Sequence, residues 1–135
     1  MIPRRESRER ALELLYEAEA KGQPPGEVVA GQTLRPEPFV VDLVTGVESR
    51  TAELDEVLSR FAKGWAVDRM PVLDRAILRM ATFELLAHLE TPLAVVISEA
   101  VELAKRYSTE DSGKFVNGVL AGVAGEVRPP APGTV

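Results

Sequence analysis

The stretch EDSGKFVNGVL, residues 110–120, decides how this chain is interpreted. Four apolar residues follow the i, i+3, i+4, i+7 spacing of a buried helix face: Val116, Val119, Leu120 and Val123. At helical spacing Phe115 points about 90° away from the centre of that face. The stretch therefore predicts a helix with an aromatic ring at the margin of its core face.

Helical patterns continue outward from this stretch over most of the chain. A run of good helix formers at residues 4–21 ends at Gly22, before the breaker Pro24-Pro25. Further helices are predicted at residues 26–31, 37–61, 71–88, 92–107 and from about 110 to about 125. No strand-like alternation appears. The sequence predicts an all-α fold, a compact bundle of about seven helices, two of them short.

Length and composition set the class of protein. At 135 residues with 45% hydrophobic residues, the chain is long enough for one domain with its own core. The absence of cysteine excludes disulfides and thiolate metal sites. No stretch resembles a signal peptide or reaches the roughly 18 apolar residues of a membrane helix. We expect a cytoplasmic protein without membrane contact, folded over residues 1–127, with a disordered tail at 128–135.

Enzyme chemistry finds little support in the sequence. The single histidine, His88, stands at the end of a predicted helix, without a nucleophile motif, where it fits a capping cation better than a catalyst. Gly113-Lys114 lacks the spacing of a phosphate-binding loop. We expect no catalytic residue, no metal site and no cofactor.

The charge balance limits how the chain can bind nucleic acid. Sixteen Lys and Arg face 21 Asp and Glu, which gives a net charge of −5. The summed field of such a chain repels phosphate. An RNA site must therefore be a small local patch, helped by a partner.

The arginines at the start of the first predicted helix form one such patch. Three apolar residues share a face further along that helix: Ala11, Leu15 and Ala18. Projected backwards, the face reaches Arg4 and Arg8, and Arg5 lies beside it. Positive charge opposes the dipole at a helix N-terminus, which suggests an external anion suited to planar guanidinium groups. The alternative is that Arg4 and Arg8 pair with Glu9, Glu13 or a carboxylate of another helix.

Phe115 has two interpretations as well. Gly118 and Gly122 lie on its side of the helix and leave the ring open, while Lys114 and Asn117 flank it. An aromatic ring with a neighbouring cation and amide is a common way to hold an unpaired base. The alternative is that another helix packs over the two glycines and covers Phe115.

Four motifs in the sequence resemble the NusB family of bacterial transcription antitermination factors. They are RRESRE at residues 4–9 leading to Leu15-Tyr16, LDRAILR at 73–79 with FEL at 83–85, EAVELAK at 99–105, and DSGKFVNGVL at 111–120. Together they cover nearly the whole chain, and the last is highly specific. The resemblance implies two packed helical sub-bundles that bind the boxA element of nascent ribosomal RNA leader transcripts, together with the ribosomal protein NusE, within the RNA polymerase antitermination complex.

The resemblance also implies which residues make these contacts. Seven fall where the family meets RNA: Arg4, Arg5, Arg8, Asp111, Lys114, Phe115 and Asn117. Tyr16 and Glu84 fall where it meets RNA or NusE. Glu84 lies in an apolar stripe and needs a cationic partner, either an internal arginine or a cation on NusE. Tyr16 likewise has a polar tip on a helix edge that suits an interface.

Two other functions remain open at this point. The same fold resembles the N-terminal part of certain ribosomal RNA methyltransferases, so the chain could serve a separate catalytic protein. It could also be a structural homodimer without an RNA role, since the family includes both monomers and homodimers.

Overall fold

The computed structural model describes residues 2–129, which form seven helices and no strand. The elements are α1 (Arg4–Lys21), α2 (Pro25–Ala30), α3 (Pro38–Phe61), the 3₁₀ helix η1 (Val67–Arg69), α4 (Val72–Ala87), α5 (Leu93–Tyr107) and α6 (Glu110–Val127). The predicted all-α bundle, with two short helices among about seven, is confirmed. Within the described part of the chain, no helix is both long and apolar enough to cross a membrane.

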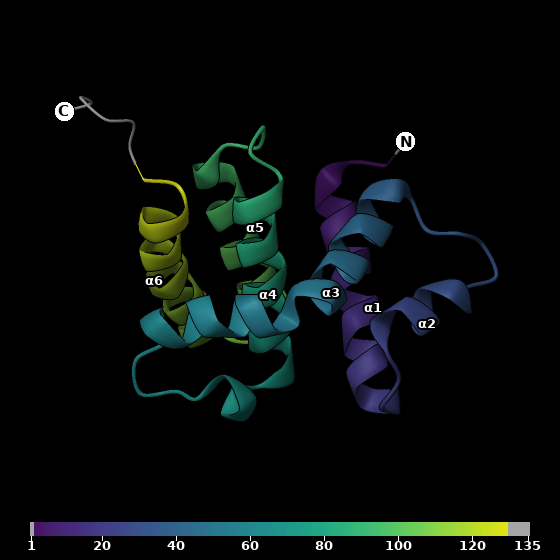
Figure 1. Cartoon of the computed structure of the whole chain (residues 1–135), viewed down its shortest axis with the longest axis horizontal. Coiled ribbons are helices and arrows are strands. Elements are labelled where there is room, and N and C mark those ends of the chain that lie inside the picture. The colour runs from purple at the N-terminus through teal and green to yellow at the C-terminus, as the bar shows by residue number, and fades with distance from the viewer. Residues whose placement is uncertain (1, 130–135) are drawn as a thin grey trace.

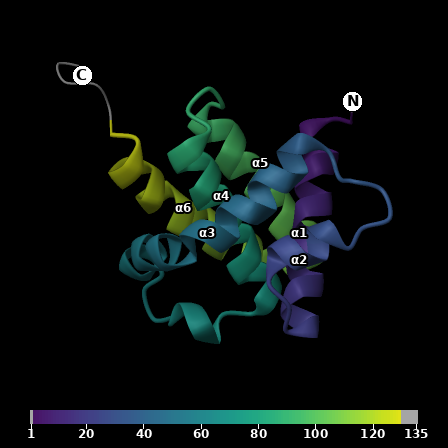
Figure 2. The same cartoon turned by 45° about the vertical axis from the view of Figure 1, so that its right-hand side comes forward.

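Two sub-bundles share the helix α3. In Figure 1, α1 and α2 lie on one side, α4, α5 and α6 on the other, and α3 runs from the first group to the second. Figure 2 shows α3 crossing the α4–α6 group, against which it packs. The helix bends at Arg50, where φ is −119° and ψ is 17°. Next to it, the Thr51 hydroxyl donates to the Val47 carbonyl oxygen at 2.6 Å, a back-bond of the kind that bends helices.

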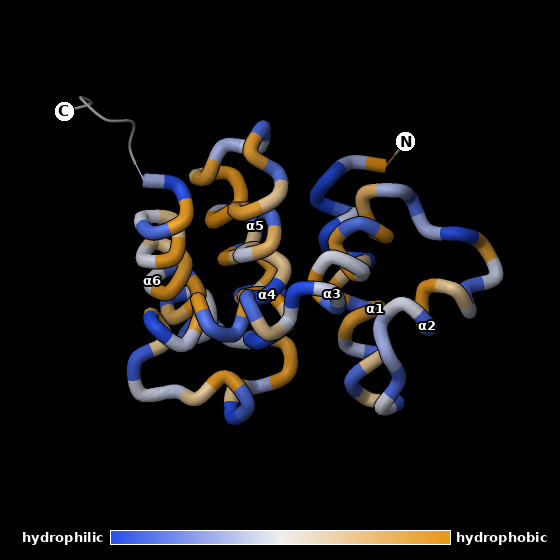
Figure 3. Tube along the Cα trace, in the orientation of Figure 1, coloured by the Kyte–Doolittle hydropathy of each residue, from blue (hydrophilic) through white to orange (hydrophobic). Residues whose placement is uncertain are grey.

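One hydrophobic core runs through both sub-bundles. Figure 3 shows hydrophobic and hydrophilic residues alternating in bands along the helices, as amphipathic helices require. The face predicted for α6 is buried as expected, with its four members at 0–3% exposure: Val116, Val119, Leu120 and Val123. This confirms the helical phase from which the position of Phe115 was inferred.

The helix ends follow local chemistry. Gly22 adopts the left-handed conformation with φ 64° and closes α1 at the predicted residue. Thr109 caps α6, since its hydroxyl oxygen accepts a hydrogen bond from the Ser112 amide at 3.0 Å. At the start of α5 the capping residue is Pro92, and no side chain accepts a hydrogen bond there.

The C-terminal boundary also differs from the prediction. Arg128, placed by the sequence in a disordered tail, belongs to the folded domain. Its guanidinium donates to four carbonyl oxygens at the end of α4 and just after it, those of Glu84, Leu85, His88 and Thr91. A cation at these carbonyls complements the C-terminal end of the helix dipole. Residues 130–135 of the predicted tail lie outside the described part of the chain.

Candidate nucleic-acid interface

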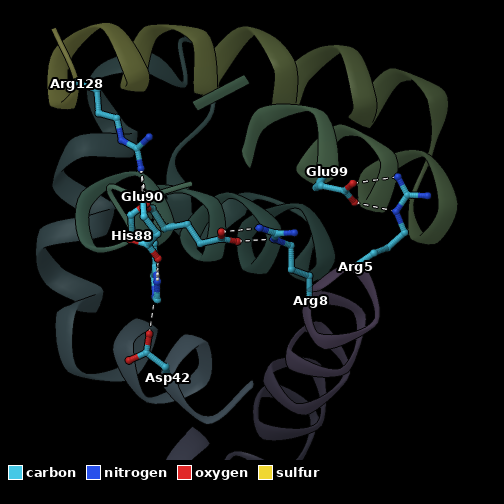
Figure 4. Close-up of polar contacts among 8 residues, drawn as sticks. Arg5, Arg8, Asp42, His88, Glu90, Glu99 and Arg128 are labelled. Carbon is cyan, nitrogen blue, oxygen red and sulfur yellow. Dashed lines mark hydrogen bonds and ion pairs between the residues drawn. The ribbon is translucent and has the colours of Figure 1, made fainter. Parts of the chain in front are cut away.

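Arg5 lies on the surface but is already paired. Its guanidinium donates two hydrogen bonds to the Glu99 carboxylate on α5, at 2.9 and 3.0 Å (Figure 4). The hydrogen bond to Glu99 raises the pKa of Arg5, and the same bond lowers the pKa of Glu99. The Arg5 side chain is still 55% exposed, whereas that of Glu99 is 17% exposed. An RNA phosphate can therefore reach Arg5, but it competes with an internal carboxylate.

Arg8 is buried, in contrast to the open position expected for it. It is 5% exposed and donates two hydrogen bonds to Glu84 on α4, at 2.6 and 2.8 Å. Burial by itself lowers the pKa of Arg8, but the hydrogen bond and charge of Glu84 outweigh it, so the pKa is raised. The expectation that Arg8 avoids internal carboxylates is wrong, and of the two partners considered for Glu84 the internal arginine is the one present. The cause is packing, because both residues lie in the apolar stripes where α1 meets α4.

Of the three candidates Arg4, Arg5 and Arg8, Arg4 is the one that has no carboxylate partner among residues 2–129. Its guanidinium carbon lies 3.7 Å from the centroid of the Phe39 ring on α3. Such a cation–π contact orients the guanidinium without neutralising it. Arg4 is exposed, so its full charge faces solvent.

The start of α6 exposes the polar side chains that flank Phe115. Lys114 and Asn117 are exposed, and Phe115 is half-buried against the core. A Cβ added to Gly118 would meet nothing within 4 Å, so the surface of α6 is uncovered at Gly118. The second glycine is different: a Cβ on Gly122 would lie 2.4 Å from the Phe61 ring of α3. The prediction that both glycines leave the surface bare is therefore correct for Gly118, the one next to Phe115, and wrong for Gly122.

Asp111, the remaining candidate on α6, and Arg5 on α1 lie near different residues of α5. Asp111 is exposed in the first turn of α6. On α5, Lys105 covers Gly113 of α6, and Glu99 holds Arg5 of α1. Asp111 and Phe115 line the same hollow, whereas Arg5 is held at Glu99, a different position on α5.

Tyr16 borders an apolar hollow of about 260 Å³. The hollow is lined by Leu12, Glu13, Tyr16, Leu73 and Tyr107. Both tyrosines are partly exposed, at 48% and 38%. An apolar surface with phenol groups at its edge is typical of protein contacts.

His88 has a structural position. It ends α4, and its ring contacts the carboxylates of Asp42 and Glu90 (Figure 4). The ring also packs edge-on against Phe39 and Phe83. Over residues 2–129 no three acidic or histidine side chains are grouped as a metal site requires.

Sequence reasoning missed two participants in this region. Glu99, which holds Arg5, lies 94 residues away from it, so no local pattern relates them. Trp65 is 51% exposed and its ring centroid lies 6.3 Å from that of Phe115. The sequence did contain one signal for Trp65: it is the single tryptophan, and it falls in a predicted turn rather than on a predicted core face.

Both the sequence and the fold are similar to those of known proteins. The model of the NusB family matches residues 5–125. A transcription antitermination protein NusB of Salinispora tropica is 47% identical over 92% of this chain and 96% of its own. The structure of T. maritima NusB has a TM-score of 0.84 at 34% identity and covers 95% of this chain and 94% of its own. A crystal structure of the antitermination factors NusB and NusE in complex with dsRNA contains a chain with a TM-score of 0.76 at 28% identity, covering 91% and 96%.

Proposed function

This chain belongs to the NusB family, and we propose that it binds the boxA element of nascent ribosomal RNA leader transcripts together with NusE. In this role it acts in the cytoplasm as a component of the RNA polymerase antitermination complex. The relatives are transcription antitermination proteins rather than enzymes. A related NusB has been crystallised with NusE and dsRNA, which supports both classes of partner for this chain.

The single observation that carries the RNA assignment is the surroundings of Phe115. The ring is half-buried, so its position is fixed, and the neighbouring surface of α6 is uncovered at Gly118. Lys114 and Asn117 lie exposed on the same turn. A fixed ring costs little entropy when a base stacks on it, while Lys114 neutralises a phosphate and Asn117 reads a base edge. Asp111, one turn earlier, accepts from a base donor.

The arginine turn supplies the second part of the RNA surface. Arg4 carries an unpaired charge toward solvent, and Arg5 is exposed beside it. Arg8 contributes through its buried pair with Glu84, which holds the first turns of α1 against α4 and so fixes the direction of Arg4 and Arg5. Glu84 is buried in the same pair, so it affects the binding of any partner only indirectly, through the position of α1.

The hollow beside Tyr16 is the proposed surface for NusE. Its apolar lining is the larger part of the contact, and Glu13 at its edge offers a carboxylate to a basic partner. The net charge of −5 favours such a partner electrostatically. A bound basic protein would extend the positive surface available to RNA.

Gel shifts with single-stranded boxA RNA, with and without NusE, test the function. We expect weak binding by the chain alone and stronger binding when NusE is added. Because coupling is reciprocal, boxA should tighten NusE binding by the same factor. Phe115→Ala should weaken RNA binding and Tyr16→Ala should weaken NusE binding, while the control Leu34→Ala, which changes an exposed side chain before α3, should do neither. If boxA does not bind under any of these conditions and the chain is a homodimer, the structural alternative replaces this proposal.

A further inference from the structure

A hollow of about 270 Å³ opens beside Phe115, and we call it the Trp65 pocket. Its walls come from the turn after α3, the start of α4 and the start of α6, and its main lining residues are Trp65, Pro71, Asp74, Thr109, Asp111 and Phe115. Pockets for drug-sized ligands are about 300–1,000 Å³. The Trp65 pocket is smaller, which suits a single flat ring system.

Trp65 stands at the pocket as a second aromatic wall. Its ring packs edge-on to Phe115, with an angle of 60° between the planes. The turn that carries it is closed by a hydrogen bond from the Trp65 amide to the Ala62 carbonyl oxygen at 3.1 Å, and it includes Gly64 at φ 83°. Half of this large apolar side chain nevertheless remains in water. Such exposure lowers fold stability relative to burial, so the core does not account for it.

The pocket also contains a buried acceptor that lacks a donor. Asp74 is 4% exposed, and its Oδ2 accepts from the Ser112 hydroxyl at 3.0 Å. Its Oδ1 is buried and receives no hydrogen bond from residues 2–129. Buried polar atoms in folded proteins nearly always have a partner, so this carboxylate oxygen can take one further donor.

We propose that the Trp65 pocket takes one unpaired base of the bound RNA, stacked on the Trp65 ring beside Phe115, with its amino group donating to Asp74. The inference rests on the proposed RNA-binding function and adds Trp65 and Asp74 to the residues that carry it. No Lys or Arg lines the pocket, whereas Asp74 and Asp111 do. The pocket therefore repels phosphate and favours a group that carries N–H donors. The phosphate next to the base would lie at Lys114, outside the pocket.

A cationic side chain of a protein partner is the competing occupant. Such a group would enter past the exposed Lys114, which has the same charge, and it would lose its hydration on entering. A neutral base avoids both costs and can stack on the face of one aromatic ring while its edge meets the other. The observations therefore favour the base.

The chain's own fluorescence offers a direct test, because Trp65 is its single tryptophan. Single-stranded boxA RNA should quench the emission of the full chain during titration, since a stacked base quenches an indole. Trp65→Ala should reduce affinity by about 5-fold to about 150-fold, the loss expected for one stacked base. Trp65→Phe keeps an aromatic wall and should retain most of the affinity. Thermal unfolding of each variant shows whether the fold is intact.

A set of modified RNAs locates the base and its amino group. In one series each base in turn is removed, and one abasic position should weaken binding to the wild-type chain while leaving Trp65→Ala unaffected. In a second series each amino base is replaced by its counterpart without the amino group, such as guanine by hypoxanthine. The replacement at the same position should weaken wild-type binding but not binding by Asp74→Asn.

The outcomes separate this inference from the proposed function. If boxA binds with full affinity to Trp65→Ala and leaves the fluorescence unchanged, the pocket assignment is wrong and the RNA function stands. If Trp65→Ala and Asp74→Asn weaken NusE binding and not RNA binding, the occupant is a protein cation. If boxA does not bind to the wild-type chain at all, both proposals fail. Should Trp65→Ala not fold, the abasic series and the quenching of the wild-type chain decide the question.

Discussion

Arg8 on α1 and Glu84 on α4 face each other inside the protein, joined by two parallel hydrogen bonds of 2.6 and 2.8 Å. Removing one partner leaves the other as an unpaired buried charge, which costs about 3–5 kcal/mol. Arg8→Ala and Glu84→Ala should each lower the free energy of unfolding by about this amount, measured by urea denaturation. Arg60→Ala, which breaks the exposed pair with Glu126, is the control and should have a much smaller effect. Equal losses for Arg8 and Arg60 would contradict the structural role.

Glu99 limits the charge that Arg5 can offer to RNA. Glu99→Gln should raise boxA affinity a few-fold, because the phosphate no longer competes with a carboxylate. Glu126→Gln is a matched control, since it makes the same charge change and breaks another bidentate pair, with Arg60. An equal rise for both variants would mean that overall charge, and not the release of Arg5, controls binding.

The pair of Arg5 and Glu99 also gives a pH dependence with a defined sign. The hydrogen bond from Arg5 lowers the pKa of Glu99 in the folded state. The resulting stabilisation is present above the ordinary glutamate pKa of about 4.3 and is lost as pH falls through the lower folded-state value. Arg5→Ala should therefore be slightly less stable than wild type at pH 7, and the difference should vanish in acid. Unfolding measured across this pH range checks it, and a difference that persists in acid would contradict the assignment.

Two glycines of α6 form a matched pair for testing the fold around Phe115. A methyl group on Gly118 meets nothing within 4 Å, so Gly118→Ala should stabilise the helix by up to about 1 kcal/mol. A methyl group on Gly122 would clash with the Phe61 ring, so Gly122→Ala should destabilise by about 1–3 kcal/mol. Thermal or urea unfolding should show opposite signs. The same sign for both would mean that α3 does not pack over α6 as described.

The salt dependence of RNA binding should be shallow. Three side chains are exposed and positioned for phosphates: Arg4, Arg5 and Lys114. Each neutralised phosphate on a single strand contributes about −0.7 to the slope of log affinity against log salt, so the total should be about −2. Titrations over a range of salt concentrations measure the slope for the chain alone. A slope well beyond this value would require contacts outside the proposed surface, and Lys114→Ala should reduce it by about 0.7.

Helix positions and the core face of α6 were predictable from the sequence because both depend on local spacing and on breakers such as Gly22. The pairing of the arginines was not. Arg8 and Glu84 are 76 residues apart, and their contact exists only once α1 packs on α4. The stripe that contains Arg8 was read correctly as a continuation of the apolar face, but that continuation turned out to be buried. Coverage of Gly122 by Phe61 depends in the same way on the path of α3, which no pattern in α6 reveals.

The bend at Arg50 makes α3 a member of both sub-bundles, and this has a consequence for how the protein unfolds. Neither sub-bundle has a complete core without its half of the helix, and the α1–α4 contact joins them again through Arg8 and Glu84. Opening one half therefore exposes apolar surface of the other. The two halves should behave as a single cooperative unit, with amide hydrogens on both sides of Arg50 exchanging through the same global event.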